Sequence, residues 1–196
     1  MDSKSLEIEF HGPYKWYGSN SIFLQPESEK FGIYLWAVPI EDNYLVYYVG
    51  ETGVSFADRI LDHTRNYLNG LYRVYEPTSF VKGEKTLVWE GMWKKEPGNP
   101  NRRMALFLER YQELCKVIYD FLGALKIFLV PFESENRIRQ RIEAAISKTL
   151  LNQPEVVGEF QDKDIKYVSR RPDEEPIQVA IKSGEKILGL PKELAV

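Results

Sequence analysis

The sequence has few of the residues that build most disulfide and zinc sites. It contains one cysteine, Cys115, among 196 residues. A single cysteine excludes an internal disulfide and any cysteine-rich zinc cluster. Because Cys115 lies in an apolar run with helical periodicity, we interpret it as a buried structural thiol. The disulfide-rich and cysteine–zinc classes of protein are therefore excluded.

Long apolar runs and glycine-rich phosphate loops are missing as well. No apolar run approaches the ~18 residues of a membrane span, and the polar start of the chain does not resemble a signal peptide, so the cytoplasm is the expected location. The turn Gly50–Gly53 is too short for a P-loop or a dinucleotide fingerprint. The composition is that of an ordinary globular protein, with 43% hydrophobic and 28% charged residues. The length of the chain suits one domain.

Charge is unevenly distributed along the chain. The net charge of −3 argues against indiscriminate nucleic-acid binding. Residues 1–58, however, carry 3 basic and 9 acidic side chains, whereas residues 64–110 carry 9 basic and 5 acidic ones. Residues 136–150 carry 4 basic side chains and one acidic. A fold that gathers the two basic segments on one face would attract backbone phosphates; scattered solvated charge is the alternative.

Hydrophobic periodicity predicts an α+β fold. Residues 31–38 and 44–49 are apolar, β-prone runs joined by a short turn, which predicts an antiparallel hairpin. Pro39 is expected to end the first of its two strands. Ser55 is a good N-cap for a helix to about Leu68, with Asp58 at its third position. Further elements are expected at 86–93 (strand), 102–122 (long helix), 126–132 (third core strand), 135–151 (helix capped by Ser134) and 177–181 (strand).

This order predicts a small sheet with helices packed on it and no doubly wound βαβ series. Residues 1–30 are expected to be an irregular N-terminal leader packed on the core. The predicted domain spans 31–153, with an insertion at about 64–101, and residues 154–196 form a C-terminal extension.

Arg59 and His63 are four residues apart and therefore share one face of the predicted helix. Arginine can bind a phosphate through two parallel donors, and histidine can bind the same phosphate or move a proton near neutral pH. The alternative is an ordinary surface pair with Asp58 and Asp62 as ion partners.

Glu143 lies at the border of the apolar stripe of its predicted helix. A carboxylate placed there can be half-buried and can serve as a magnesium ligand, because Mg²⁺ often uses one or two carboxylates together with waters and substrate phosphate. Arg139 is four residues earlier, so a plain ion pair on the helix surface is the alternative.

Tyr34 and Tyr48 lie in the two strands of the predicted hairpin. Free tyrosine has a pKa of roughly 10 and is a poor base at neutral pH. A nearby cation such as Arg59, or a metal ion, would lower this pKa so that the tyrosine could accept a proton from water or orient it. The alternative is that both are core residues, as most strand tyrosines are.

Together, these residues resemble the GIY-YIG endonuclease family. The pattern consists of Gly32-Ile33-Tyr34, Tyr48-Val49-Gly50, Arg59, His63, Glu143 and Asn152, in this order along the chain. The resemblance covers about residues 31–153 and implies a small three-stranded antiparallel sheet flanked by helices. It also implies hydrolysis of DNA phosphodiester bonds with one active site per chain and Mg²⁺ as cofactor, for which Mn²⁺ is expected to substitute.

The resemblance also implies a role for each residue. Tyr34 would be the base, and Tyr48 would be a second hydroxyl facing water or phosphate. Arg59 would stabilise the phosphate charge, and His63 would contact phosphate or shuttle a proton. Glu143 would be the metal ligand, and Asn152 would be a supporting polar residue.

Three features depart from the family pattern. The gap of 13 residues between Tyr34 and Tyr48 is longer than is common, which a longer turn can absorb, and the spacing from Glu143 to Asn152 is shorter than usual. Glu51 follows Tyr-Val-Gly directly, where relatives often have lysine or a small polar residue. Its charge would either weaken DNA binding or add to the metal site.

DNA is the expected partner, with contacts predicted from Arg65, Arg139, Lys94 and Lys95. Trp89 and Trp93 could stack on bases beside these lysines, or both could be buried. No membrane partner is expected, and a homodimer is one way for a single-site nuclease to cut both strands. The alternatives are a catalytically weak or inactive nucleic-acid-binding module of the same fold, and an interaction domain that binds no nucleic acid.

Overall fold

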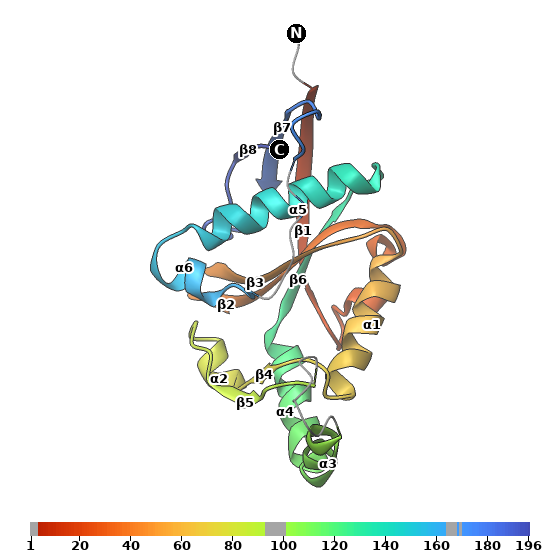
Figure 1. Ribbon diagram of the computed structural model, residues 1–196, viewed down its shortest axis with the longest axis vertical. Helices are drawn as coiled ribbons and strands as arrows, with labels where there is room; N and C mark the ends of the chain where they lie inside the picture. Colours follow the sequence, from red (N-terminus) through yellow and green to blue (C-terminus); the bar gives the residue numbers. More distant parts are fainter. Residues whose placement is uncertain (1–3, 93–100, 164–167, 169) are drawn as a thin grey trace.

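Two consecutive strands, β2 (Gly32–Ile40) and β3 (Asn43–Thr52), form an antiparallel hairpin at one edge of the main sheet (Figure 1). The structure is a computed structural model that describes residues 4–92, 101–163, 168 and 170–196. The sequence predicts that Pro39 terminates the first strand, but β2 continues through Pro39 to Ile40. The neighbouring strand β6 (Lys126–Pro131) pairs with β2 only as far as Ala37, so Pro39 lies where β2 has no neighbour on that side.

The main sheet has six strands in the order β3-β2-β6-β1-β7-β8, and it is strongly curled (Figure 1). The predicted small three-stranded antiparallel sheet is therefore wrong. Strands β3, β2 and β6 are antiparallel and adjacent, but β1 (Lys4–Lys15) pairs with the free edge of β6. Strand β7 (Ile177–Ser183) then pairs parallel with β1, and β8 (Glu193–Ala195) pairs antiparallel with β7. The resulting sheet is mixed rather than antiparallel.

The extra strands come from the two segments that were expected to lie outside the predicted domain 31–153, the N-terminal leader and the C-terminal extension. In β1 the alternating residues Ile8 and Phe10 are buried, which is the period-2 pattern of a half-buried strand. Strand β7 buries Ile177, Val179 and Ile181 in the same way. Both segments therefore contribute to the hydrophobic core. Strand β1 covers an edge of β6 that would otherwise expose unpaired backbone groups, and β7 in turn pairs with β1.

The sheet separates two hydrophobic clusters. Tyr34, Trp36 and Val38 of β2 point to what we call the α1 face, which helices α1 (Phe56–Leu68) and α4 (Tyr111–Ala124) cover. Residues Ile33, Leu35 and Ala37 point to the α5 face, which helix α5 (Asn136–Leu151) covers (Figure 1). Both faces of the hairpin are thus buried, as its nearly continuous apolar pattern predicts.

A β-bulge in β3 sets the direction of its tyrosines. The pairing register shifts where Trp36 lies opposite Tyr48 and Ala37 lies opposite Val46, so Tyr47 is the additional residue. As a result, Tyr47 and Tyr48 both join the cluster of the α1 face although they are consecutive. The bulge is therefore what allows Tyr48 to lie beside Tyr34 while Val46 remains on the α5 face.

The predicted helices, and the strand predicted at 86–93, are present with three differences. Ser55 caps α1 by accepting the backbone N–H of Asp58, as predicted. The expected single helix at 102–122 is interrupted at Arg110, which separates α3 (Arg102–Glu109) from α4. Helix α5 has Glu135 rather than Ser134 as its N-cap residue. The expected strand at 86–93 is shortened to β5 (Leu87–Trp89) among the residues that the structure describes.

The remaining elements are short. They are η1 (Ile22–Leu24), η2 (Pro26–Glu29), β4 (Val74–Tyr75), α2 (Pro77–Phe80) and α6 (Glu155–Phe160). Strands β4 and β5 pair with each other. Within the described ranges, the structure contains no helix that is both long enough and apolar enough to cross a membrane.

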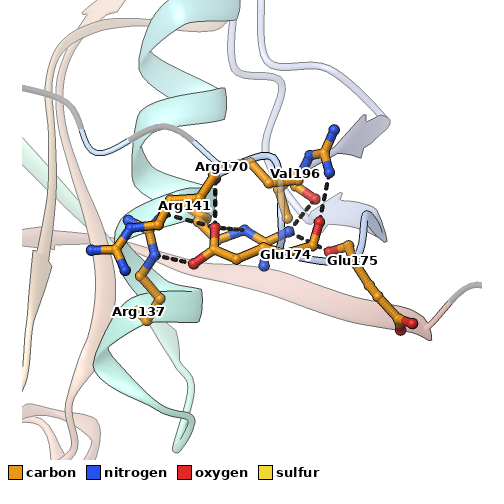
Figure 2. A network of polar contacts seen from close by, with 7 residues as sticks. Arg137, Arg141, Arg170, Glu174, Glu175 and Val196 are labelled. Atoms are coloured by element: carbon orange, nitrogen blue, oxygen red, sulfur yellow. Dashed lines mark hydrogen bonds and ion pairs between the residues drawn. The ribbon is translucent and has the colours of Figure 1, made fainter.

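An arginine network ties the C-terminal segment to α5 (Figure 2). Arg137 donates to the two carboxylate oxygens of Glu174 at 2.5 and 2.7 Å. Arg141 is buried and donates to the backbone oxygens of Val196 at 2.6 Å and Glu175 at 2.7 Å. These two arginines are therefore engaged by the C-terminal segment, so neither is a free basic group on the surface of α5.

Gly50 lies where the hairpin can accommodate no side chain. A Cβ atom there would lie 2.4 Å from Cζ and 2.5 Å from the hydroxyl of Tyr34, and 2.7 Å from Cε1 of Tyr48. We expect Gly50→Ala to lower the free energy of unfolding by about 1–3 kcal/mol, as overpacking in a core does. Chemical denaturation measures this effect.

Gly184→Ala is the matched control for Gly50→Ala, because a Cβ atom at Gly184 meets no atom within 4 Å. Its effect should stay within about 0.5 kcal/mol. Equal effects of the two substitutions would show that Gly50 is not required by the close approach of Tyr34.

Candidate functional site

The hydroxyl of Tyr34 is the centre of a hydrogen-bonded cluster on the α1 face. It lies 2.8 Å from Nε2 of His63 and accepts a hydrogen bond from Nε of Arg59 at 3.2 Å. Arg59 and His63 lie one turn apart on α1, and both reach down to β2, so the alternative of an ordinary surface pair does not describe them. Tyr34 itself is completely buried.

Tyr48 lies beside this cluster. Its ring centroid is 5.9 Å from that of Tyr34, and it stacks on Trp36 at 4.5 Å. The two side chains also shift each other's pKa, since Tyr48 acts to lower that of Tyr34 and Tyr34 acts to raise that of Tyr48. The two tyrosines of the sequence pattern are therefore in contact, together with the arginine and the histidine.

Burial dominates the ionisation of the two tyrosines. Desolvation raises the pKa of Tyr34 to about 12, although the charge of Arg59 and its hydrogen bond act in the opposite direction. Burial, and then Tyr34, raise the pKa of Tyr48 well above its ordinary value. Arg59 therefore acts to lower the pKa of both tyrosines, as the sequence predicts, but the loss of hydration outweighs its charge and the net pKa of each tyrosine lies above the ordinary value.

His63 is neutral at pH 7. Its side chain is only 3% exposed, and burial together with the charge of Arg59 lowers its pKa to about 3. Its Nδ1 lies 3.2 Å from the hydroxyl of Tyr72, and the edge of its ring packs against Trp36 at 4.6 Å. The imidazole therefore has hydrogen-bond partners at both nitrogens and is fixed in orientation.

Arg59 remains charged and is half-buried. Burial lowers its pKa, but the neighbouring Tyr34 and Tyr48 raise it more, so the net shift is upward. The guanidinium has five N–H donors, of which Nε–H is directed at Tyr34. Its other donors can bind an anion that approaches this face.

Glu143 reaches the same end of the hairpin from α5. Its Oε1 accepts the backbone N–H of Glu51 at 3.1 Å, and β3 is the edge strand of the sheet. Burial, and then the charge of Glu51, raise its pKa to about 7, against the lowering effects of the N–H bond and Arg59. The charge of Glu143 also raises the pKa of Tyr34 and of Tyr48, so the carboxylate lies within electrostatic reach of the cluster.

Glu51 forms an ion pair with Arg139, with Nε and Oε2 3.2 Å apart and side chains that are 17% and 6% exposed. The predicted alternative, in which Arg139 pairs with Glu143 along the helix, is replaced by this pair. Arg139 also donates to the backbone oxygen of Ser134 and lies over the ring of Phe31 at 5.1 Å. Arg139 is therefore an internal residue that balances Glu51, and it does not face solvent where DNA would bind.

The other predicted residues lie apart from the cluster. Asn152 is exposed at the C-cap of α5, about 14 Å along the helix from Glu143. Arg65 is exposed on α1 and pairs with Asp62 at 3.3 Å. Trp89 is buried and donates to the backbone oxygen of Gly70 at 2.7 Å. Lys94, Lys95 and Trp93 lie outside the described residues.

Sequence reasoning missed Tyr72, Asn66 and Trp36. Asn66 lies three residues after His63 on α1 and donates from Nδ2 to the hydroxyl of Tyr72 at 3.0 Å. This spacing places Asn66 near His63 on the helix surface and could have identified it. Tyr72 follows the end of α1, and no periodic pattern indicates that the chain turns back there.

The donor set at the end of β3 suits a hard cation. The described residues contain no group of three or more histidine, cysteine, aspartate and glutamate side chains that could hold a metal ion. Glu143 supplies a half-buried carboxylate, and Mg²⁺ in particular is often held by one or two carboxylates together with waters and substrate phosphates. The residues present therefore fit magnesium bound partly by the protein and partly by a phosphate substrate.

Comparisons with known protein families, with curated proteins and with solved structures found no match.

The raised pKa of Glu143 predicts that stability falls as the pH rises. The ordinary value is 4.5 and the value in the fold is about 7. Protonated Glu143 contributes roughly 3 kcal/mol to the free energy of unfolding. This contribution is complete below the ordinary pKa and is lost as the pH rises through the pKa in the fold. Glu143→Gln keeps an acceptor for the N–H of Glu51 but has no charge, so its stability should not fall in this way as the pH rises.

Urea unfolding of wild type and Glu143→Gln at about pH 5 and about pH 8 measures the difference. The variant should gain stability relative to wild type at the higher pH. The same pH dependence in both proteins would show that Glu143 ionises normally.

Proposed function

We propose that this protein is a metal-dependent DNA endonuclease that hydrolyses phosphodiester bonds at the Tyr34–Arg59–His63–Glu143 site. The observation that carries the proposal is the convergence of these residues. One buried hydroxyl, that of Tyr34, contacts both an arginine and a neutral histidine, and a carboxylate with a raised pKa lies at the same end of the hairpin. The resemblance of the sequence to GIY-YIG endonucleases supports the same chemistry.

Arg59 binds the phosphate in this mechanism. Its Nε–H holds Tyr34, and its remaining donors contact the non-bridging oxygens of the scissile phosphate. Negative charge on these oxygens increases in the transition state, so a fixed and permanently charged guanidinium stabilises the transition state more than the ground state. Because Tyr34 positions the same guanidinium, the phosphate is held beside the hydroxyl that takes part in proton transfer.

Tyr34 and His63 move the proton. A tyrosine with a pKa of about 12 stays protonated at pH 7, so it can accept a proton from water only if it gives up its own. The attacking water forms a bond to phosphorus and transfers a proton to the oxygen of Tyr34, while the proton of Tyr34 passes to Nε2 of His63. The bond between phosphorus and the leaving deoxyribose oxygen breaks, and solvent supplies the proton to this oxygen.

Glu143 would hold the metal ion, with Mg²⁺ as the proposed cofactor and Mn²⁺ as a substitute. When bound, the ion supplies Lewis-acid stabilisation of the phosphate and of the leaving oxygen. The N–H of Glu51 orients the carboxylate of Glu143. The ion pair between Glu51 and Arg139 compensates the charge of Glu51 beside the phosphate. Glu51 therefore need not weaken DNA binding.

A nucleic acid is the proposed substrate because basic residues continue from the helix that carries Arg59. Within the described part of the basic segment 64–110, the exposed lysines and arginines are Arg65, Lys82, Lys85 and Arg102. A polymer with one phosphate per nucleotide would interact with several of them at once, and its affinity would fall with salt.

The test is incubation of supercoiled plasmid with the purified protein in Mg²⁺, in Mn²⁺ and in EDTA. We expect nicked or linear DNA with either metal and intact plasmid in EDTA. Salt-sensitive DNA binding without cleavage in any metal would replace the proposal with a nucleic-acid-binding module of the same fold. The absence of both binding and cleavage would contradict a role in nucleic-acid chemistry.

A further inference from the structure

A cavity of about 470 Å³ lies where β1 ends and β6 begins. The end of β1 and the turn after it contribute residues 15–19, α4 contributes Asp120 and Gly123, and β6 contributes Lys126. A volume of this size can hold a small organic molecule. None of these residues has a role in the mechanism proposed above, so the cavity is a separate feature of the fold.

Two lysines of the lining are direct partners in the sheet. Lys15 lies opposite Lys126 in the antiparallel pairing of β1 with β6, and residues directly opposite each other in such a pair carry their side chains on the same side of the sheet. Like charges in this arrangement repel each other and destabilise a sheet. Burial, and then the charge of Lys15, lower the pKa of Lys126, so the two ammonium groups affect each other. The stability of the fold therefore does not explain this pair.

Lys126 is held at the C-terminal end of α4, which leads directly into β6 (Figure 1). Its Nζ donates to the backbone oxygens of Gly123 at 3.0 Å and Ala124 at 3.5 Å. Carbonyl groups at the end of a helix carry partial negative charge and stabilise a cation there. Because an ammonium group has three N–H donors, one donor of Lys126 remains for a ligand in the cavity.

Lys15 has no comparable partner. Among the residues that the structure describes, no hydrogen bond or ion pair involves its ammonium group. The carboxylate of Asp120 also lines the cavity, but it forms an ion pair with Lys116 at 2.6 Å. The charge of Asp120 is thus compensated outside the cavity, and the positive charge of Lys15 is left without a counter-charge.

The turn after β1 adds a hydroxyl, from Ser19, and two aromatic side chains that are fixed in place. Trp16 donates from Nε1 to Oγ1 of Thr64 at 2.7 Å. Tyr17 stacks on Tyr119 with 4.3 Å between ring centroids and donates to the backbone oxygen of the same residue at 3.0 Å. Side chains that are already ordered lose little conformational entropy when a ligand binds.

We propose that this cavity binds a small organic phosphate, with Lys15 and Lys126 as the ligands of its phosphate group. A phosphate monoester carries a charge of about −1.5 to −2 at pH 7, so it can compensate both ammonium groups and remove their repulsion. The organic part of the molecule lies against Trp16 and Tyr17. Lysine commonly binds phosphate as a point charge, and this site requires neither a metal ion nor cleavage of DNA.

Isothermal titration calorimetry in metal-free buffer tests the proposal, with thymidine 5′-monophosphate and inorganic phosphate as probes and thymidine as the uncharged counterpart. We expect both phosphates to bind to wild type and thymidine not to bind. Lys15→Met removes one ammonium group and no described contact, so it should remain folded and weaken the binding of the nucleotide about tenfold or more. Lys192→Met is the control, because Lys192 is exposed and lies outside the cavity, and its Kd should equal that of wild type.

Two single-stranded oligonucleotides of one sequence, with a 5′-phosphate and with a 5′-hydroxyl, distinguish the sources of the phosphate group. Tighter binding of the phosphorylated strand to wild type, but not to Lys15→Met, would assign the site to the end of a DNA strand. Equal binding of the two strands, together with binding of the nucleotide, would assign it to a free phosphate ester.

Two results would overturn the proposal. One is that neither phosphate probe binds to wild type at millimolar concentration. The other is that Lys15→Met binds the nucleotide as tightly as wild type does. Both results are independent of plasmid cleavage, so a failure of this proposal and a failure of the proposed nuclease function are distinguished.

Discussion

Arg59→Ala is expected to reduce kcat/KM for DNA cleavage by about 10²–10³, the usual effect of removing one fixed donor that faces the charge of a transition state. Two functions disappear with this side chain. The phosphate loses a permanently charged ligand, and Tyr34 loses the Nε–H donor that positions its hydroxyl. The change should appear mainly in kcat, since other basic groups contribute to DNA affinity.

Arg65→Ala provides the matched control on the same helix. Arg65 is exposed and pairs only with Asp62 among the ion pairs that the structure describes. Its loss should weaken DNA binding slightly, with a smaller dependence on salt, and leave kcat unchanged. Equal losses of kcat in the two variants would contradict the specific role of Arg59, and full activity of Arg59→Ala would eliminate it from the mechanism.

Arg139→Met is expected to lower the free energy of unfolding by about 3–5 kcal/mol, the typical cost of removing one partner from a buried ion pair. Arg139 is only 6% exposed, and it balances Glu51, which is 17% exposed. Without the guanidinium, the charge of Glu51 is left uncompensated beside Glu143, and Ser134 loses a donor to its backbone oxygen. Urea or thermal unfolding measures the loss.

The double substitution Glu51→Gln with Arg139→Met tests the cause. Removing both charges should restore much of the stability, because a buried pair can often be replaced by neutral groups at little cost. Lys116→Met is a control on a surface pair, with Lys116 and Asp120 at 2.6 Å and side chains 79% and 43% exposed, and should cost less than about 1 kcal/mol. No recovery in the double variant would show that packing, and not charge, explains the loss.

Local patterns in the sequence predicted the hairpin and most of the helices. Continuous apolar runs defined β2 and β3, and the cap at Ser55 and Asp58 placed the start of α1 correctly. These features depend on residues close together in the chain. The size of the sheet depends instead on the pairing of β1 with β7, which joins Lys4–Phe10 to Ile177–Ser183, and no local pattern reveals such a partner.

The site shows the same division between local and distant information. The spacing of Arg59 and His63 predicted a shared helix face, and the structure places both on Tyr34. The bulge at Tyr47 and the turn that brings Tyr72 back to His63 have no periodic signal. The role of Arg139 could not be predicted because its partner, Glu51, lies 88 residues away in the chain.

Charge patterning along the sequence was the least reliable guide to the surface. Three of the four basic residues of segment 136–150 are engaged by other parts of the protein. Arg137 binds Glu174 and Arg141 binds backbone oxygens (Figure 2), and Arg139 binds Glu51. A local excess of arginine indicates a binding face only if the fold leaves the side chains exposed. Residues 64–110 retain exposed basic groups, so the proposed DNA contacts are assigned to this segment.

The most direct test of the proposed function compares wild type with Glu143→Gln in metal-dependent plasmid cleavage, with DNA binding and unfolding measured on the same samples. Glutamine keeps the hydrogen bond to the N–H of Glu51 and removes the charge that would hold the metal ion. We expect wild type to cleave DNA in Mg²⁺, and we expect the variant to bind DNA and remain folded but no longer cleave it. Cleavage by Glu143→Gln at the wild-type rate, with the same dependence on Mg²⁺, would contradict the assignment of this site as the catalytic centre.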